Sequence, residues 1–138
     1  MTRIQKRRQK RISAIMCFFQ YFATKDDMET IIETFEQDIV PYNHSEFFVV
    51  FDDDFKSLLT IAIEYETQII DRINSLLRDG WKFERLPMID RAILFMAISE
   101  ITLEFDDRAI IINEAIEISK IFSEEDQYKY INGLLDKL

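Results

Sequence analysis

The segment IINEAIEISKIF, residues 111–122, decides between helix and strand for this chain. Its apolar side chains recur every three or four residues, at Ile111, Ala115, Ile118 and Phe122. This spacing places them on one face of an α-helix, and Glu114, Glu117 and Lys120 are then expected outside that face. The segment therefore predicts an amphipathic helix that buries one side.

The same spacing recurs along the rest of the chain. It predicts helices within residues 12–22, 28–39, 58–77, 89–101 and 130–135, and the stripe at 58–77 is long enough for two helices in succession. Signals for helix ends are Asp52 to Asp54 as N-caps, Gly80 as a stop, Pro87 for a first turn, and Ser123 with Asp126 as a near capping box. Residues 47–51 have a strand-like composition but are too few to build a sheet, so we expect a packed connection there. The pattern predicts an all-α fold of about seven helices.

Length and composition indicate one domain, residues 1–138, with 48% hydrophobic and 31% charged side chains. The longest uninterrupted apolar run, Ala92 to Ile98, is far shorter than the roughly 20 residues of a membrane-spanning helix. The single cysteine, Cys17, permits no internal disulfide, and no signal-peptide cleavage site follows the basic start. We expect a cytoplasmic protein that does not associate with membranes.

Charge is strongly segregated along the chain. Six of the 17 basic side chains lie within the first eleven residues, which hold no acidic side chain; the other eleven share the remaining chain with all 26 acidic ones. We call residues 3–11 the basic segment. A local cationic cluster can contact phosphates although the net charge of −9 repels them, and a solvated terminus fits the composition equally well.

Patterns typical of catalysis or metal binding are not recognisable. The only histidine, His44, lies in a polar loop, and one histidine with one cysteine cannot supply the four ligands of a structural zinc site. Two glycines are too few for a phosphate-binding glycine loop, and Asp52 to Asp54 lack the glycine and glutamate of an EF-hand. Cys17 falls off the apolar stripe of its helix without a base nearby in the sequence, which is typical of an inert thiol. We expect no enzyme activity, no cofactor and no metal.

Three segments together resemble the NusB family of transcription antitermination factors. The first is RRQKRISAIMCFFQ at residues 7–20, similar to the family's arginine-led opening helix. The second runs from Ile70 through Trp81 and Leu86 to Ile101. The third is INEAIEISK at residues 112–120 followed by YINGLLDK at 130–137, in the order and spacing of the family's signature. The resemblance covers essentially the full length.

Four positions depart from the family's pattern. Ala62 and Ser123 stand where glycine is common, Asp107 where proline is common, and Phe95 where arginine is common. Phe95 therefore removes a cation that the family usually has. The other three departures resemble local variation at helix ends or in packing.

The resemblance implies two small helical bundles packed together and a role in transcription antitermination, which can extend to ribosomal RNA synthesis. NusB-like proteins pair with a small-subunit ribosomal protein, called NusE in that setting, and the pair binds boxA-type single-stranded RNA. The implied partners are therefore this RNA, NusE and the transcription elongation complex. The basic segment suits phosphates, and the acidic remainder suits a basic ribosomal protein.

The resemblance also implies an RNA site made of charged and aromatic side chains: Arg7, Arg8, Arg11, Phe19, Asp126 and Tyr130. The neighbouring cations Lys6, Lys10 and Lys129 are further candidates for phosphate contact. For the three arginines, phosphate contact is favoured over a solvated surface position. For the two N-terminal lysines, phosphate contact and solvation are equally favoured. Phe19 matches a position that can stack on bases, although core packing is the commoner fate of such a residue. Helix capping by Asp126 and burial of the Tyr130 ring are the alternatives at the other end. Trp81 and Leu86 are expected in the core.

A partner surface is expected from charge and from its approximate place in the family, at Glu64, Tyr65, Glu66, Glu84 and Arg85. A solvated acidic face is the alternative for these residues. Two other functions remain open. The chain could be a fragment of an RNA cytosine-5 methyltransferase, some of which carry a NusB-like domain, and this would fail if the chain is complete. It could also be a protein-only scaffold with an incidental basic start.

Overall fold

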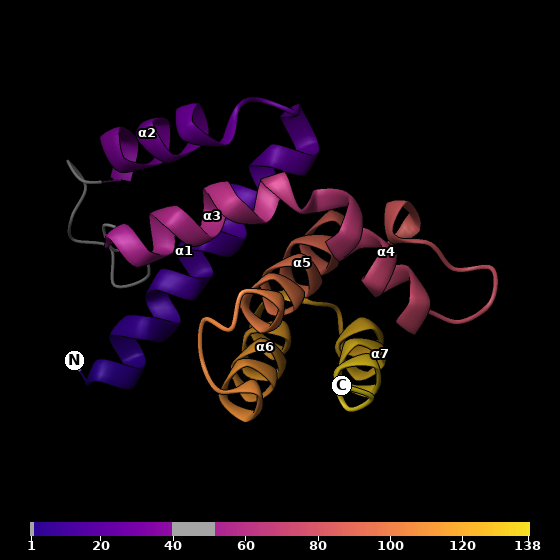
Figure 1. The fold of residues 1–138 in the computed structure, drawn as a ribbon. Helices are drawn as coiled ribbons and strands as arrows, with labels where there is room; N and C mark the ends of the chain where they lie inside the picture. Colours follow the sequence, from indigo (N-terminus) through magenta and orange to yellow (C-terminus); the bar gives the residue numbers. More distant parts are fainter. Residues whose placement is uncertain (1, 40–51) are drawn as a thin grey trace.

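The computed structural model describes residues 2–39 and 52–138, and these contain seven α-helices, one 3-10 helix and no β-strand (Figure 1). The helices are α1 (Arg3–Thr24), α2 (Met28–Ile39), α3 (Asp53–Glu64), α4 (Glu66–Leu76), the 3-10 helix η2 (Phe83–Arg85), α5 (Met88–Thr102), α6 (Arg108–Phe122) and α7 (Glu125–Leu135). The predicted all-α fold is confirmed. The predictions for His44 and residues 47–51 lie outside the described residues. No helix in the described ranges is both long and apolar enough to cross a membrane.

Most helix ends lie where the sequence carries its signals. Asp52 is the N-cap of α3, and its carboxylate accepts a hydrogen bond from the backbone N–H of Phe55. Helices α3 and α4 meet at Tyr65, so the long apolar stripe forms two helices as predicted. Gly80, in the turn after α4, has a φ of 84°, which favours glycine. Pro87 directly precedes the first residue of α5.

The capping box predicted for Ser123 and Asp126 is wrong. Helix α7 begins after Glu124, which makes no side-chain capping bond. Ser123 instead donates from Oγ to Oδ1 of Asp90 over 2.5 Å, linking the α6–α7 connection to the start of α5. Asp90 is 1% exposed, and its other carboxylate oxygen has no hydrogen-bond partner among the described residues. Burial, only partly offset by Ser123, raises the pKa of Asp90.

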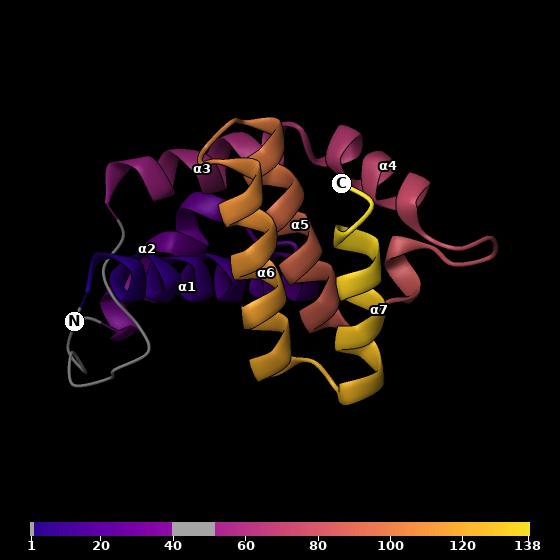
Figure 2. The ribbon, with the colours of Figure 1, turned by 90° about the horizontal axis from the view of Figure 1, so that it is seen from below.

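Helix α5 runs through the middle of the molecule and joins two groups of helices (Figures 1 and 2). Helices α1, α2 and α3 pack against one another, and α4, α6 and α7 pack around α5. The most extensive contact in the fold is between α1 and α5, which connects the two groups. This arrangement agrees with two small bundles packed together, and it carries the N-terminal half of α1 away from α4 and α7 (Figure 1).

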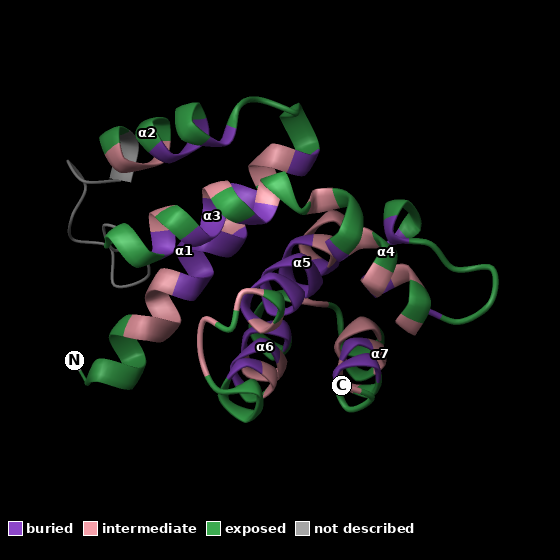
Figure 3. Ribbon diagram, viewed as in Figure 1, coloured by how far each residue is buried: buried purple, intermediate pink, exposed green. Residues whose placement is uncertain are grey.

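The centre of α5 is buried on all sides. Every residue from Ala92 to Glu100 is buried, which is typical of a helix at the centre of a fold (Figure 3). The ring of Phe95 lies 4.9 Å from that of Phe18 and 5.1 Å from that of Phe22, both on α1, in edge-on geometry. The position where the family commonly has arginine is therefore part of the apolar core in this chain.

Cys17 also belongs to this core. The sequence pattern placed it off the apolar stripe, which is wrong, since the side chain is fully buried. Burial raises the pKa of its thiol to about 12, and the thiol stays protonated at neutral pH.

Candidate nucleic-acid interface

The basic segment forms the first turns of α1. A capping box fixes its start: the Thr2 hydroxyl accepts a hydrogen bond from the Gln5 N–H, and the Gln5 side chain accepts one from the Thr2 N–H. Four of the six cations form ion pairs with carboxylates from other parts of the chain, and Arg3 and Lys6 pair with none of the described residues. The segment is thus a helix of partly neutralised cations.

Arg11 is a buried member of this segment. It is 3% exposed, its Nε and Nη2 lie 3.0 and 2.9 Å from Oε1 of Glu100, and its Nη2 lies 3.1 Å from Oδ2 of Asp106. Burial raises the pKa of Glu100 although Arg11 opposes that change. The phosphate contact predicted for Arg11 is not supported, because this buried guanidinium cannot reach a phosphate without leaving the buried carboxylate of Glu100 unpaired.

Arg8 is less exposed than Lys6 but far more exposed than the buried Arg11. Its Nε and Nη2 donate to the two carboxylate oxygens of Glu114 on α6, at 2.6 and 3.0 Å. The Arg8 side chain is 34% exposed, whereas that of Glu114 is 7% exposed. The prediction that Glu114 lies outside the buried face of its helix is wrong, because its carboxylate reaches back to α1 and is neutralised there. The pair orients Arg8 while leaving part of its side chain accessible.

Arg7 is held between two aromatic rings. Its guanidinium carbon lies 5.5 Å from the ring centre of Phe55 on α3 and 5.1 Å from that of Phe105, after α5. One of its nitrogens also lies 3.3 Å from Asp106, and 28% of the side chain is exposed. Helix α3 and the connection between α5 and α6 therefore hold Arg7 of α1 in one orientation, with part of its side chain open to solvent.

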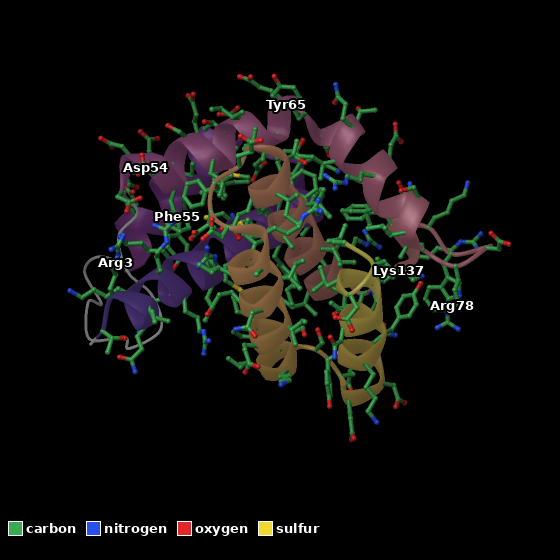
Figure 4. All side chains as sticks on the ribbon, turned by 60° about the horizontal axis from the view of Figure 1, so that its bottom comes forward. Arg3, Asp54, Phe55, Tyr65, Arg78 and Lys137 are labelled. Carbon is green, nitrogen blue, oxygen red and sulfur yellow. The ribbon has the colours of Figure 1, made fainter. Side chains whose placement is uncertain are left out.

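Lys6 and Lys10 lie beside Arg7 along the same end of the molecule. With Arg3 and Asp52 they line a hollow of about 390 Å³ (Figure 4 shows Arg3, Asp54 and Phe55 at this end). Nζ of Lys10 is 2.8 Å from Oδ2 of Asp52. Partial burial acts to raise the pKa of Asp52, but Lys10 and the helix N-cap bond outweigh it and hold the pKa below its ordinary value.

Phe19 lies farther along α1, with 37% of its surface exposed. Its neighbour Phe18 is fully buried and takes the core position. Of the two fates weighed for Phe19, full burial in the core does not occur. An exposed ring on the helix that carries the cations is available for stacking.

Tyr130 joins a second aromatic group beside Arg78, and Figure 4 shows Arg78 at the opposite end of the molecule from Arg3. Its ring centre lies 5.6 Å from that of Trp81, and the Arg78 guanidinium lies 4.7 Å from the Tyr130 ring. The Tyr130 hydroxyl accepts a hydrogen bond from the backbone N–H of Arg78. Asp126 is exposed, and Lys129 pairs with Glu125 on the same helix.

Trp81 was expected in the core and is 39% exposed, whereas Leu86 is buried as expected. The tryptophan follows the Gly80 turn, so its indole lies over Tyr130 at the surface. Sequence reasoning missed Arg78 and Trp81 as neighbours of Tyr130. The available signal was an aromatic residue flanked by Arg78 and Lys82 in a glycine-containing turn, a composition typical of surface recognition loops.

The predicted partner residues lie on two elements that both contact α4. Glu64, Tyr65 and Glu66 form the α3–α4 junction, where Tyr65 is 44% exposed and Glu66 accepts a hydrogen bond from the Tyr21 hydroxyl. Glu84 and Arg85 are exposed on η2.

Comparison with known proteins agrees with this architecture. The family model described as the NusB family matches residues 8–138. The chain is 34% identical to the transcription antitermination protein NusB of Psychromonas ingrahamii, over 96% of this chain and 86% of that protein. It is 33% identical to the protein of the same name from Staphylococcus epidermidis, over 96% and 97%.

Solved structures share the fold. T. maritima NusB superposes with a TM-score of 0.73 at 31% identity, covering 95% of this chain and 88% of that one. A structure described as antitermination factors NusB and NusE in complex with double-stranded RNA matches with a TM-score of 0.68 at 17% identity, covering 99% and 96%. Since the family model spans nearly all of the sequence and relatives above 30% identity are matched over most of their length, the chain belongs to the NusB family.

Proposed function

We propose that this chain is a transcription antitermination factor that pairs with the ribosomal protein NusE, binds boxA-type single-stranded RNA and acts within the transcription elongation complex in the cytoplasm. In this proposal residues 1–138 act as one RNA-binding unit without catalytic activity. The observation that carries it is the row of oriented, partly exposed cations along the first turns of α1.

Phosphate contact is assigned to Lys6, Arg7, Arg8 and Lys10. Arg7 and Arg8 are held in place before any ligand arrives, by two aromatic rings and by Glu114 respectively, so little side-chain freedom remains to be lost on binding. Lys6 has no ion pair with a described residue and is exposed. Such cations contact phosphate without regard to base sequence and make binding sensitive to salt.

Base contact is assigned to the exposed ring of Phe19 and to the half-buried ring of Tyr130. The neighbours of Tyr130, the exposed Trp81 and Arg78, extend its surface. Single-stranded RNA is commonly bound by stacking of bases on aromatic and guanidinium planes. Asp126 and Lys129 flank this surface as polar contacts.

The NusE contact is assigned to the α3–α4 junction and η2, which flank α4. Three of the five residues there are glutamates, which complement a basic ribosomal protein. A structure of this fold described as a complex of NusB with NusE supports the assignment of the partner.

The test is titration of a fluorescent boxA-type single-stranded RNA with and without NusE at two salt concentrations. The double variant Lys6→Gln/Arg8→Gln should weaken binding at least tenfold and lower the slope of log K against log salt by about 1.4, since each lost phosphate contact removes about 0.7 for a single strand. Arg72→Gln is the control, which removes one positive charge from α4, away from the basic segment (Figure 1). Equal, weak RNA binding by all three proteins with NusE binding retained would show a protein-only scaffold instead.

A further inference from the structure

The hollow at the N-terminal end of α1 has one acidic wall. Among the described residues, its lining consists of four cationic side chains and one carboxylate: Arg3, Lys6, Arg7, Lys10 and Asp52. The carboxylate oxygen Oδ2 of Asp52 lies 2.8 Å from Nζ of Lys10, which is the separation expected of a charge-assisted hydrogen bond. An oxyanion of this chain thus stands where a phosphate oxygen would bind.

Asp52 differs from the other carboxylates that pair with the basic segment. The side chains of Glu100, Glu114 and Asp106 are 2, 7 and 23% exposed, whereas that of Asp52 is 42% exposed. Displacing a buried carboxylate leaves a desolvated charge without its partner. Oδ1 of Asp52 can keep its bond to the Phe55 N–H while Oδ2, which pairs with Lys10, is hydrated by water, so of these four carboxylates it is the one that a ligand can displace.

Lys10 is correspondingly the cation whose availability depends on Asp52. It is 25% exposed and its described ion pair is with this carboxylate alone. The neighbouring Arg7 is fixed by Phe55, Phe105 and Asp106 and does not depend on Asp52 for its position. A phosphate entering the hollow would therefore find Arg7 in place and Lys10 occupied.

We propose that the hollow binds one RNA phosphate and that the Asp52 carboxylate competes with this phosphate for Lys10. Asp52 must release Lys10 before the phosphate binds. The inference rests on the proposed function and adds that Asp52 lowers the affinity for RNA by occupying Lys10. Asp52 limits non-specific binding, because only a phosphate held in register by other contacts competes effectively with a tethered carboxylate.

Asp52 also caps α3, so the test must separate charge from capping. Asn is as good an N-cap as Asp, and Asp52→Asn therefore removes the charge while keeping the bond to the Phe55 N–H. Asp53→Asn is the matched control: it makes the same charge change one residue away, on an exposed side chain that pairs with no described cation. Asp52→Ser, with another good N-cap, provides a second test variant.

Binding of a fluorescent boxA-type single-stranded RNA is measured for these variants over a range of salt. Asp52→Asn should bind about two- to fivefold more tightly than Asp53→Asn, as expected from removing one exposed ion pair that competes with the ligand. Its slope of log K against log salt should steepen by up to about 0.7, since Lys10 then adds a full phosphate contact. Lys10→Gln should weaken binding more in the Asp52→Asn background than in the wild type.

Equal affinities for Asp52→Asn and Asp53→Asn would overturn the inference, because general charge repulsion would then account for both. The same holds if the effects of Lys10→Gln and Asp52→Asn are additive. In those cases RNA binding that still depends on Lys6 and Arg8 would leave the proposed function standing. A wild-type protein that binds no RNA would overturn both.

Discussion

Arg7 and Arg11 share the carboxylate of Asp106 yet differ in what they can do. Arg11 is enclosed with Glu100 and stabilises the packing of α1 on α5, whereas Arg7 keeps an open face. The sequence identified both as a cationic cluster. It could not identify their partners, because Arg11 and Glu100 are 89 positions apart, and which cation is buried depends on how α1 crosses α5.

Asp90 leads to a prediction about pH. Its folded-state pKa is raised by burial, so the folded state binds more protons than the unfolded state between the ordinary and the raised pKa, and stability falls as pH rises through that window. Asp90→Asn removes this loss and should raise the free energy of unfolding at pH 7 by an amount on the order of 1 kcal/mol, since a neutral buried amide costs less than a carboxylate with one unpaired oxygen.

The measurement is urea unfolding of wild type and Asp90→Asn at pH values from 4 to 7. Ser123→Ala is a second variant for comparison, because it removes the hydrogen bond to Asp90. In this variant the free energy of unfolding should fall more steeply with rising pH than in the wild type. A pH profile for Asp90→Asn parallel to that of the wild type would show that Asp90 does not titrate in this way.

At the level of helices, amphipathic periodicity was sufficient to predict most elements, including the division of the long stripe at Tyr65 and the capping of α3 by Asp52. It was insufficient at α5 and α6. Helix α5 is buried all round and has no solvated face to reveal its neighbours, and Glu114 on α6 is polar yet buried. Both depend on charge pairing and packing with α1, which local spacing does not encode.

Alanine substitutions of two phenylalanines should distinguish a residue of the helical core from a residue of the helical surface. Phe95→Ala, at the centre of α5, should lower the free energy of unfolding by about 3–5 kcal/mol, the range for removing a fully buried aromatic ring. Phe19→Ala should lower it by about 1 kcal/mol or less, because that ring is 37% exposed. RNA affinity should respond in the opposite order, with Phe19→Ala weakening binding by about 1–3 kcal/mol for a lost base stack.

Denaturant unfolding and RNA titration of the same two proteins make this comparison, the titration being carried out at a temperature where Phe95→Ala is still folded. If Phe19→Ala is as destabilising as Phe95→Ala and leaves RNA affinity unchanged, Phe19 serves packing alone.

For the whole molecule, the fold and its family followed from the sequence because the signature segments extend along the full chain. The candidate binding surfaces could be predicted from the sequence less completely than the fold. The basic segment was evident from charge, but the grouping of Arg78, Trp81 and Tyr130 requires the α4–η2 turn to lie over α7, a contact between residues about fifty positions apart. The two surfaces proposed to contact RNA, marked by Arg3 and Arg78, and the α3–α4 junction, marked by Tyr65, lie on separate parts of the molecule (Figure 4).

This separation predicts that NusE and RNA binding can be altered independently. Tyr65→Ala, at the exposed α3–α4 junction, should weaken NusE binding by about 2 kcal/mol if the tyrosine is an interface anchor, and should leave RNA binding by the chain alone unchanged. Ile121→Ala, an exposed apolar truncation on α6, is the control. Calorimetry with purified NusE and the RNA titration give the two affinities, and an equal loss in both would contradict separate surfaces.

The exposed position of Trp81 has an optical consequence. It is the only indole of the chain, and it lies beside Tyr130 and the Arg78 guanidinium at one end of the molecule. Its fluorescence therefore reports on that end alone. A nucleobase that stacks there will quench the emission, while a phosphate that binds the basic segment at the far end will leave it unchanged, so unlabelled protein can reveal in which order an RNA strand engages the two ends.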